Sequence, residues 1–218
     1  LAKLLKMEMT TAHLIGAGTA ICGGSAIAAV GPAVRARSDQ MALALAVVFI
    51  LNSVALLVFP LVGRLLDLDQ HTFGLWAAIA IHDTSSVVGA AEAFGDEALQ
   101  IATTTKLARA LWIIPLVLLS AWWYQRATQK RNHARVSIPW FIVGFVATAI
   151  VGSYFNDINS ISVSLFEVGK RLLVFCLFLI GLSLTLKSIR AAGFKPMLLA
   201  LALWIFIATG SLWWLLNL

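Results

Sequence analysis

The sequence predicts an all-α polytopic membrane protein, and three observations support this fold class. Apolar residues make up 61% of the 218 residues and charged residues only 12%, whereas soluble domains have about 45–50% and about 25%. Several apolar runs exceed the roughly 20 residues that a helix needs to cross a hydrocarbon core. Two of these runs carry a polar break near the middle, which a bilayer tolerates only where protein or a water-filled cavity covers it. We therefore expect a transporter-like bundle with two broken or re-entrant helices.

The first half of the chain is predicted to hold two broken segments and two full spans. Residues 1–10 are mixed and basic, which indicates the end of a connecting loop. The first broken segment covers residues 11–34, and small residues that allow close helix packing fill its second half. A full span follows over residues 41–66. The second broken segment covers residues 73–95, and a long helix covers residues 97–124.

Three further spans are predicted over residues 138–156, 161–186 and 196–217. Trp122, Trp123 and Arg126 mark an interface facing the cytoplasm, because aromatic belts and positive loops are typical of that side. We expect residues 1–218 to form a single integral-membrane domain, the C-terminal part of a longer transporter. A multi-pass position in a membrane follows from these spans.

The net charge of +6 indicates membrane topology and not nucleic-acid binding. Most Lys and Arg residues lie in short loops between the predicted spans, as the positive-inside rule expects. The lipid bilayer is therefore the expected partner. Cys22 and Cys176 both lie in membrane-embedded sequence and indicate no disulfide framework.

The sequence leaves two paths open for the broken segments. If both cross the membrane fully, they run in the same direction, because one span separates them. If both are re-entrant, they enter from opposite sides and meet at the midplane. The positive-inside rule does not decide, because hairpins move Arg35 and Arg37 inward but Arg64 outward.

The first break reads Thr19-Ala20-Ile21-Cys22-Gly23-Gly24-Ser25. Backbone N–H groups that start its second half-helix, near Gly23 and Gly24, carry positive dipole and suit an anion. The side chains of Thr19, Cys22 and Ser25 are candidates for further substrate contacts. The alternative is close packing by a stripe of small residues, with the polar atoms bonded to the backbone.

The second break reads His82-Asp83-Thr84-Ser85-Ser86. His82 and Asp83 are the candidate ion-coupling residues, because burying ionisable groups in the membrane is costly unless they are paired or hydrated. Thr84 or Ser85 is the predicted N-cap of a helix that restarts at about Ser86, and all three are candidate substrate contacts. The alternative is a capped turn with an internal His–Asp pair.

Lys106 and Arg109 lie three residues apart and share a helix face. They are candidates for lining an anion pathway. A structural ion pair with Asp83 or Glu92 explains them equally well, as does snorkelling to the interface.

The sequence does not favour an enzyme. Cys22, His82 and Asp83 are the residue types of a nucleophilic set, but nothing in the sequence places Cys22 beside His82, and no nucleophile-elbow motif surrounds them. His82 with Asp83 offers too few ligands for a zinc site. We expect no enzymatic activity, no metal and no cofactor.

Four motifs resemble the signature of the YeiH-type family of bacterial membrane proteins. They are residues 18–29 (GTAICGGSAIAA), 81–90 (IHDTSSVVGA), 106–109 (KLAR) and 138–141 (IPWF). The resemblance implies a fold like those of bile-acid symporters and sodium/proton antiporters, in which two discontinuous helices cross near the midplane. It also implies further spans before residue 1 and the family label of sulfate export. Some members carry His-Glu where this chain has His82-Asp83, which fits a role for the carboxylate.

The sequence thus favours a secondary transporter that moves a small anion by alternating access, with proton or sodium coupling. A passive channel is one alternative, and a membrane scaffold or sensor that transports nothing is another. Formation of a homo-oligomer stays open.

Overall fold

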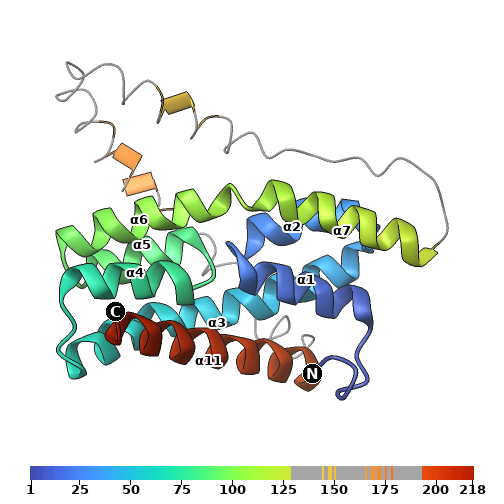
Figure 1. Cartoon of the computed structure of the whole chain (residues 1–218), viewed down its shortest axis with the longest axis horizontal. Helices are drawn as coiled ribbons and strands as arrows, with labels where there is room; N and C mark the ends of the chain where they lie inside the picture. Colours follow the sequence, from blue (N-terminus) through green and yellow to red (C-terminus); the bar gives the residue numbers. More distant parts are fainter. Residues whose placement is uncertain are drawn as a thin grey trace.

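The computed structural model describes residues 1–128, residues 193–218 and scattered positions between 144 and 178. Every regular element in these ranges is an α-helix, as predicted. In chain order the helices are α1 (Met9–Ala20), α2 (Gly24–Ala33), α3 (Ser38–Leu65), α4 (Gln70–Ala80), α5 (Thr84–Glu92), α6 (Asp96–Ala110), α7 (Ile113–Thr128) and α11 (Phe194–Leu216) (Figure 1). The predicted spans over residues 138–156 and 161–186 lie outside the described residues.

Three helical stretches among the described residues are long and apolar enough to cross a membrane. They are Ser38–Leu65, Asp96–Arg126 and Phe194–Leu216. Their length and composition agree with the spans predicted over residues 41–66, 97–124 and 196–217, but the predicted long helix over 97–124 is interrupted between α6 and α7. Large apolar side chains on these helices face outward: Leu57 is 74% exposed and Phe206 is 77% exposed. Such exposure is expected where lipid and not water surrounds a helix.

Helices α1 and α2 form a hairpin that turns back at Ile21–Gly23. The Cβ position of Gly18 lies only 3.0 Å from the Ile27 side chain, although a continuous helix would place these residues far apart. At the open end, Glu8 before α1 accepts hydrogen bonds from the side chains of Arg37 and Gln40, at the start of α3. Both ends of the hairpin therefore lie at the same end of the molecule.

Helices α4 and α5 form a second hairpin that turns at Ile81–Asp83. Gln70 begins α4, and its Oε1 accepts hydrogen bonds from the backbone N–H groups of Glu97 (3.0 Å) and Ala98 (3.3 Å) at the start of α6. Arg64 at the end of α3 donates to the carbonyl of Ala93, just after α5, at 2.6 Å. The start of α4 and the end of α5 therefore meet at the end of α3.

The two hairpins enter from opposite ends of α3, and their tips approach each other near its middle (Figure 1). This decides between the two paths that the sequence left open, in favour of re-entrant segments. The family resemblance implied two discontinuous helices that cross near the midplane. In this structure both segments instead turn back at their breaks. The hairpins share a layout: α1 and α4 end on Ala20-Ile21 and Ala80-Ile81, sixty residues apart, and Ser25 and Ser85 follow at matching positions.

Asp69 caps the start of α4 outside the predicted membrane core. Its carboxylate accepts a hydrogen bond from the backbone N–H of Thr72 at 2.9 Å. The hydrogen bonds from Thr72 hold the pKa of Asp69 below its ordinary value. An N-cap of this kind satisfies one of the free N–H groups that every helix start presents.

Helix α11 packs against the bundle through aromatic side chains. The Trp76 indole donates from Nε1 to the Ala208 carbonyl at 2.9 Å. The Phe59 ring stacks on Trp76 at 4.3 Å and on Trp204 at 5.8 Å between ring centroids. These contacts join α3, α4 and α11 beside the second hairpin.

Candidate functional site

The candidate site lies where the two hairpin tips meet beside the middle of α3. Gly23 adopts a positive φ of 58°, a conformation that L side chains rarely adopt. A Cβ atom there would lie 3.2 Å from the Val48 side chain and 3.4 Å from the backbone carbon of His82. Gly23 therefore permits both the turn and the close approach of the two tips.

Asn52 on α3 holds the second tip, and the sequence analysis missed it. Its Oδ1 accepts hydrogen bonds from the backbone N–H groups of His82 (3.2 Å) and Asp83 (3.3 Å). Asn52 is only 3% exposed, and its Nδ2 has no partner among the described residues. A lone amide in the middle of an apolar span was the available signal, because buried polar groups in membranes are costly unless they serve a purpose.

Asp83 is the N-cap of α5. Its carboxylate accepts a hydrogen bond from the Ser85 backbone N–H at 3.2 Å and another from the Ser85 hydroxyl. The predicted N-cap, Thr84 or Ser85, is wrong by one or two residues, because the helix begins at Thr84 and not at Ser86. A carboxylate accepts from the first turn more strongly than a hydroxyl does.

His82 is buried at the second tip and is only 1% exposed. Within the described part of the chain, neither of its ring nitrogens has a hydrogen-bond partner. The predicted alternative of an internal pair between His82 and Asp83 is therefore wrong.

Lys106 and Arg109 bind the C-terminal ends of two half-helices. Lys106 is fully buried, and its Nζ donates to the carbonyls of Ile81 (2.6 Å) and Ala78 (3.3 Å). Arg109 donates from Nη1 to two carbonyls at the end of α4 and from Nη2 to two at the end of α1. The acceptors and distances are Ala78 (3.0 Å), Ile79 (2.6 Å), Thr19 (3.5 Å) and Ala20 (2.6 Å).

This arrangement replaces the ion pair that the sequence offered as one alternative. Among the described residues, neither cation lies within ion-pair distance of Asp83. Glu92, the other candidate partner, is the last residue of α5 and lies at the far end of that helix from the tip. Snorkelling does not apply to Lys106, because its ammonium group is buried at the hairpin tips. Cations at helix C-termini are stabilised by the negative end of the helix dipole.

The start of α2 is the helix end at the site that lacks a side-chain hydrogen-bond cap. Gly23 is its N-cap, and no side chain there accepts a hydrogen bond as Asp83 does in α5. Cys22 is 1% exposed, and its thiol interacts with the Ala26 backbone N–H and with Ser25. The Thr19 hydroxyl donates to the carbonyl of Ile15 in its own helix at 3.0 Å. Backbone N–H groups from Gly24 onward therefore offer the positive end of a helix dipole.

The structure thus brings most of the predicted site residues together. Both tips converge with Lys106 and Arg109, while the Thr19 side chain serves its own helix. In the described part of the chain, no group of three His, Cys, Asp or Glu side chains is placed to hold a metal ion.

Comparison with known proteins places the chain in a family. The sequence profile described as "Conserved hypothetical protein 698" matches residues 1–200. A UPF0324 membrane protein of Vibrio parahaemolyticus is 54% identical over 215 residues, which cover 99% of this chain and 69% of that protein. UPF0324 membrane proteins of Shewanella oneidensis and Bacteroides thetaiotaomicron are 55% and 46% identical, each over 96% of this chain and over 65% and 62% of their own lengths.

The chain spans about two thirds of the length of these relatives. No solved structure matches it. The family profile and the relatives nevertheless match over nearly the whole chain. The chain therefore belongs to the UPF0324 family of membrane proteins, the YeiH-type family.

Proposed function

We propose that this chain forms the substrate-binding core of a multi-pass secondary transporter for a small anion in the bacterial inner membrane. The observation that carries the proposal is the meeting of two re-entrant hairpins from opposite ends beside buried Lys106 and Arg109. Transporters built from inverted repeats place their substrate between discontinuous helices near the midplane. Alternating access then follows if the hairpins open one at a time.

The charges around the tips favour an anion. Lys106 and Arg109 offset the negative ends of α4 and α1. The positive end of α2, near Gly23–Ser25, remains without a side-chain cap, whereas Asp83 caps the start of α5 at Thr84–Ser86. Anions bind readily at helix N-termini, where N–H groups and the dipole act together. The unpartnered nitrogens of His82 and Asn52 offer further polar contacts at the second tip.

In this proposal Lys106 and Arg109 are positioning residues. Lys106 Nζ and the two Nη atoms of Arg109 donate to backbone carbonyls, so the two residues supply positive potential and fix the two tips. Asp83 and His82 take up the coupling proton or sodium ion. Sulfate is the family label, and a carboxylate satisfies the same helix ends.

The proposal treats the chain as a transporter and not as an enzyme. A passive channel differs from it because flux through a channel follows the solute gradient alone. A scaffold or sensor differs because it moves no solute. The related fold stays a proposal as well: bile-acid symporters and sodium/proton antiporters share the use of broken helices at the midplane.

The test replaces Asp83 with Asn in the full-length protein and measures sulfate flux into proteoliposomes under imposed proton and sodium gradients. Asparagine caps a helix about as well as aspartate, so Asp83→Asn removes the charge and keeps the cap. We expect coupled flux to be lost, because the variant has no carboxylate at the tip to take up the coupling proton or sodium ion. Asp69→Asn is the matched control, because Asp69 caps α4 outside the hairpin tips.

Three outcomes contradict the proposal in different ways. Normal coupled flux in Asp83→Asn shows that Asp83 does not take up the coupling ion. Flux in the wild type that ignores both ion gradients indicates a channel. A folded wild-type protein that moves neither sulfate nor small carboxylates indicates a scaffold or sensor.

A further inference from the structure

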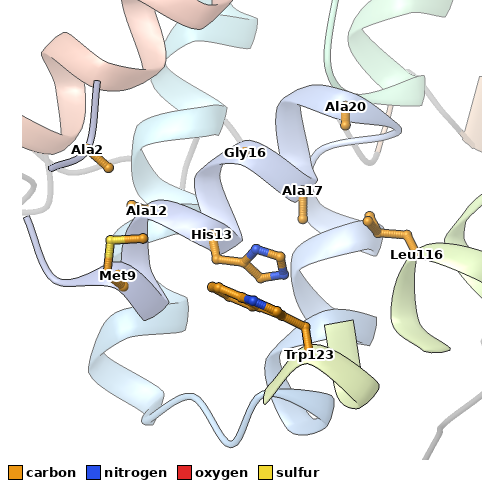
Figure 2. Close-up of a pocket in the computed structure, with 9 residues that line it drawn as sticks. All are labelled: Ala2, Met9, Ala12, His13, Gly16, Ala17, Ala20, Leu116 and Trp123. Atoms are coloured by element: carbon orange, nitrogen blue, oxygen red, sulfur yellow. The ribbon is translucent and has the colours of Figure 1, made fainter. Parts of the chain in front are cut away.

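A groove runs between α1 and α7 and reaches the hairpin tips. It consists of two cavities of about 310 and 420 Å³ that share Ala20 and Leu116 in their walls. In Figure 2, Ala2 and Met9 lie toward one side of the first cavity, and Ala20 and Leu116 lie toward the other. The second cavity continues from Ala20 to Arg109. The groove therefore joins the open end of the first hairpin to the candidate site.

The walls of the groove are mostly apolar. Towards the hairpin tip its lining on α1 consists of the small residues Gly16, Ala17 and Ala20, which leave room beside the helix. A Cβ atom at Gly16 would meet nothing within 4 Å. Cavities of roughly 300–1,000 Å³ with apolar walls and few polar groups are typical of sites for small organic molecules.

One polar side chain, His13 on α1, interrupts the apolar wall. Its Nε2 shares a hydrogen bond of 2.9 Å with the Oγ of Ser120 on α7, which lies behind the wall. Figure 2 shows the His13 ring facing Trp123, and the ring centroids are 5.6 Å apart. The pair holds the two helices together at this depth and satisfies its own polar atoms.

The deep end of the groove carries a positive charge. Arg109 lines the second cavity, together with Trp112 and Pro115. Its Nη1 and Nη2 atoms bind carbonyls, and its Nε has no partner in the described part of the chain. A carboxylate is the natural acceptor for a guanidinium that retains a free N–H group.

We propose that the groove holds the apolar body of an organic carboxylate whose charged group lies at the Arg109 end. This inference rests on the proposed anion transport and names the substrate class of that site. Inorganic sulfate has no apolar part and leaves the groove unused. Each CH₂ group that enters the groove is expected to raise the affinity about fourfold.

The experiment measures thermal stabilisation of the full-length protein by sulfate, acetate, hexanoate and hexanamide over a range of concentrations. A ligand that binds only the folded protein raises its melting temperature. We expect hexanoate to bind at least about tenfold more tightly than acetate. Hexanamide, which has the same apolar body without the charge, is expected to bind more weakly than hexanoate.

Gly16→Leu tests whether the groove is the binding place. The new side chain enters open space at residue 16, so the helix is expected to fold normally. We expect this variant to lose the preference for hexanoate and to keep its response to acetate. Gly210→Leu on α11 is the matched control, because a Cβ atom there also meets nothing within 4 Å and the residue does not line the groove.

The outcomes separate this inference from the proposed function. Equal affinity for acetate and hexanoate contradicts binding of an apolar chain in the groove, and so does an unchanged preference for hexanoate in Gly16→Leu. Neither result contradicts anion transport. Binding of hexanamide as tight as that of hexanoate also overturns it, because the groove then takes any apolar chain, as a lipid tail. A protein that responds to none of the anions overturns the anion site and the inference together.

Discussion

At the scale of single residues, Arg109 ties the two hairpins together. Its planar guanidinium reaches carbonyls at the ends of α1 and α4 at once. The variant Arg109→Lys keeps the positive charge but loses the planar guanidinium, whose donors reach several carbonyls at once. We predict that it lowers the free energy of unfolding by about 2–4 kcal/mol. Thermal melting of the full-length protein in detergent measures the change.

Arg64→Lys is the control for this prediction. Arg64 is exposed and binds one carbonyl, that of Ala93. A lysine there is expected to change the stability by less than about 1 kcal/mol. If Arg109→Lys melts at the wild-type temperature, the bridge between the hairpins does not stabilise the fold.

The sequence predicted which residues matter at the tips better than it predicted their partners. Lys106 and Arg109 were identified from their spacing on one helix face, but three explanations stayed open. Their acceptors are carbonyls that lie 25 residues earlier for Lys106 and 89 residues earlier for Arg109. Backbone carbonyls have no sequence signature, so only the fold reveals them. Asn52 was missed because its role depends on a tip that follows 30 residues later.

At the scale of elements, the breaks are set by residues that stop one helix and start the next. Gly23 has the positive φ at the first tip and packs against Val48 and the backbone of His82. We predict that Gly23→Ala lowers the stability by about 1–3 kcal/mol, because a strained conformation and a tight contact act together. It also reduces anion flux, because the two tips must separate.

Gly16→Ala, in the middle of α1, is the control for Gly23→Ala. Nothing lies within 4 Å of its Cβ position, and alanine favours a helix over glycine by about 1 kcal/mol. We expect equal or higher stability and normal flux. Melting curves and flux assays on both variants measure the two effects, and equal behaviour of the pair contradicts the special role of Gly23.

The positions of the breaks were predictable, but their direction was not. The sequence placed them within residues 19–25 and 82–86, and the helices are interrupted at Ile21–Gly23 and Ile81–Asp83. Polar and small residues within apolar runs carry that signal. A hairpin and a crossing helix have the same local sequence, however, and differ only in contacts such as Gln70 with Glu97.

At the scale of the whole molecule, the directions of the two hairpins determine which charged residues lie at each end of the bundle. Helices α1, α3 and α11 begin at the end of the molecule that holds the N-terminus, and α2 and α7 end there (Figure 1). Among the described residues, the charged residues next to these helix ends in the sequence are Lys3, Lys6, Glu8, Arg35, Arg37, Asp39, Arg126 and Lys195. Those next to the helix ends on the opposite side are Arg64, Asp67, Asp69, Glu92, Asp96 and Glu97. From the positive-inside rule we predict that the first end faces the cytoplasm. The sequence already predicted this side for Arg126, but it could not assign the ends of the hairpins, because that needed the direction of both.

The orientation gives a prediction that tests both hairpins at once. Single cysteines at Lys3, Arg35, His71 and Glu97, all exposed positions, are introduced into the full-length protein after Cys22 and Cys176 are replaced by Ser. A membrane-impermeant thiol reagent is applied to cells with a permeabilised outer membrane. We expect His71→Cys and Glu97→Cys to react, because both ends of the second hairpin lie on the outer side.

Lys3→Cys and Arg35→Cys are expected to react only after the inner membrane is disrupted, which also serves as the control for exposure of each thiol. If the broken segments crossed the membrane fully, Lys3 and Arg35 would lie on opposite sides of it, and so would His71 and Glu97. Labelling of Lys3→Cys and Arg35→Cys from different sides would therefore rule out the first hairpin. It would also remove the meeting of the tips, because only hairpins from opposite sides bring Gly23 to His82 beside Asn52. The anion site depends on that meeting, so the topology of the whole molecule is the condition on which the proposed chemistry rests.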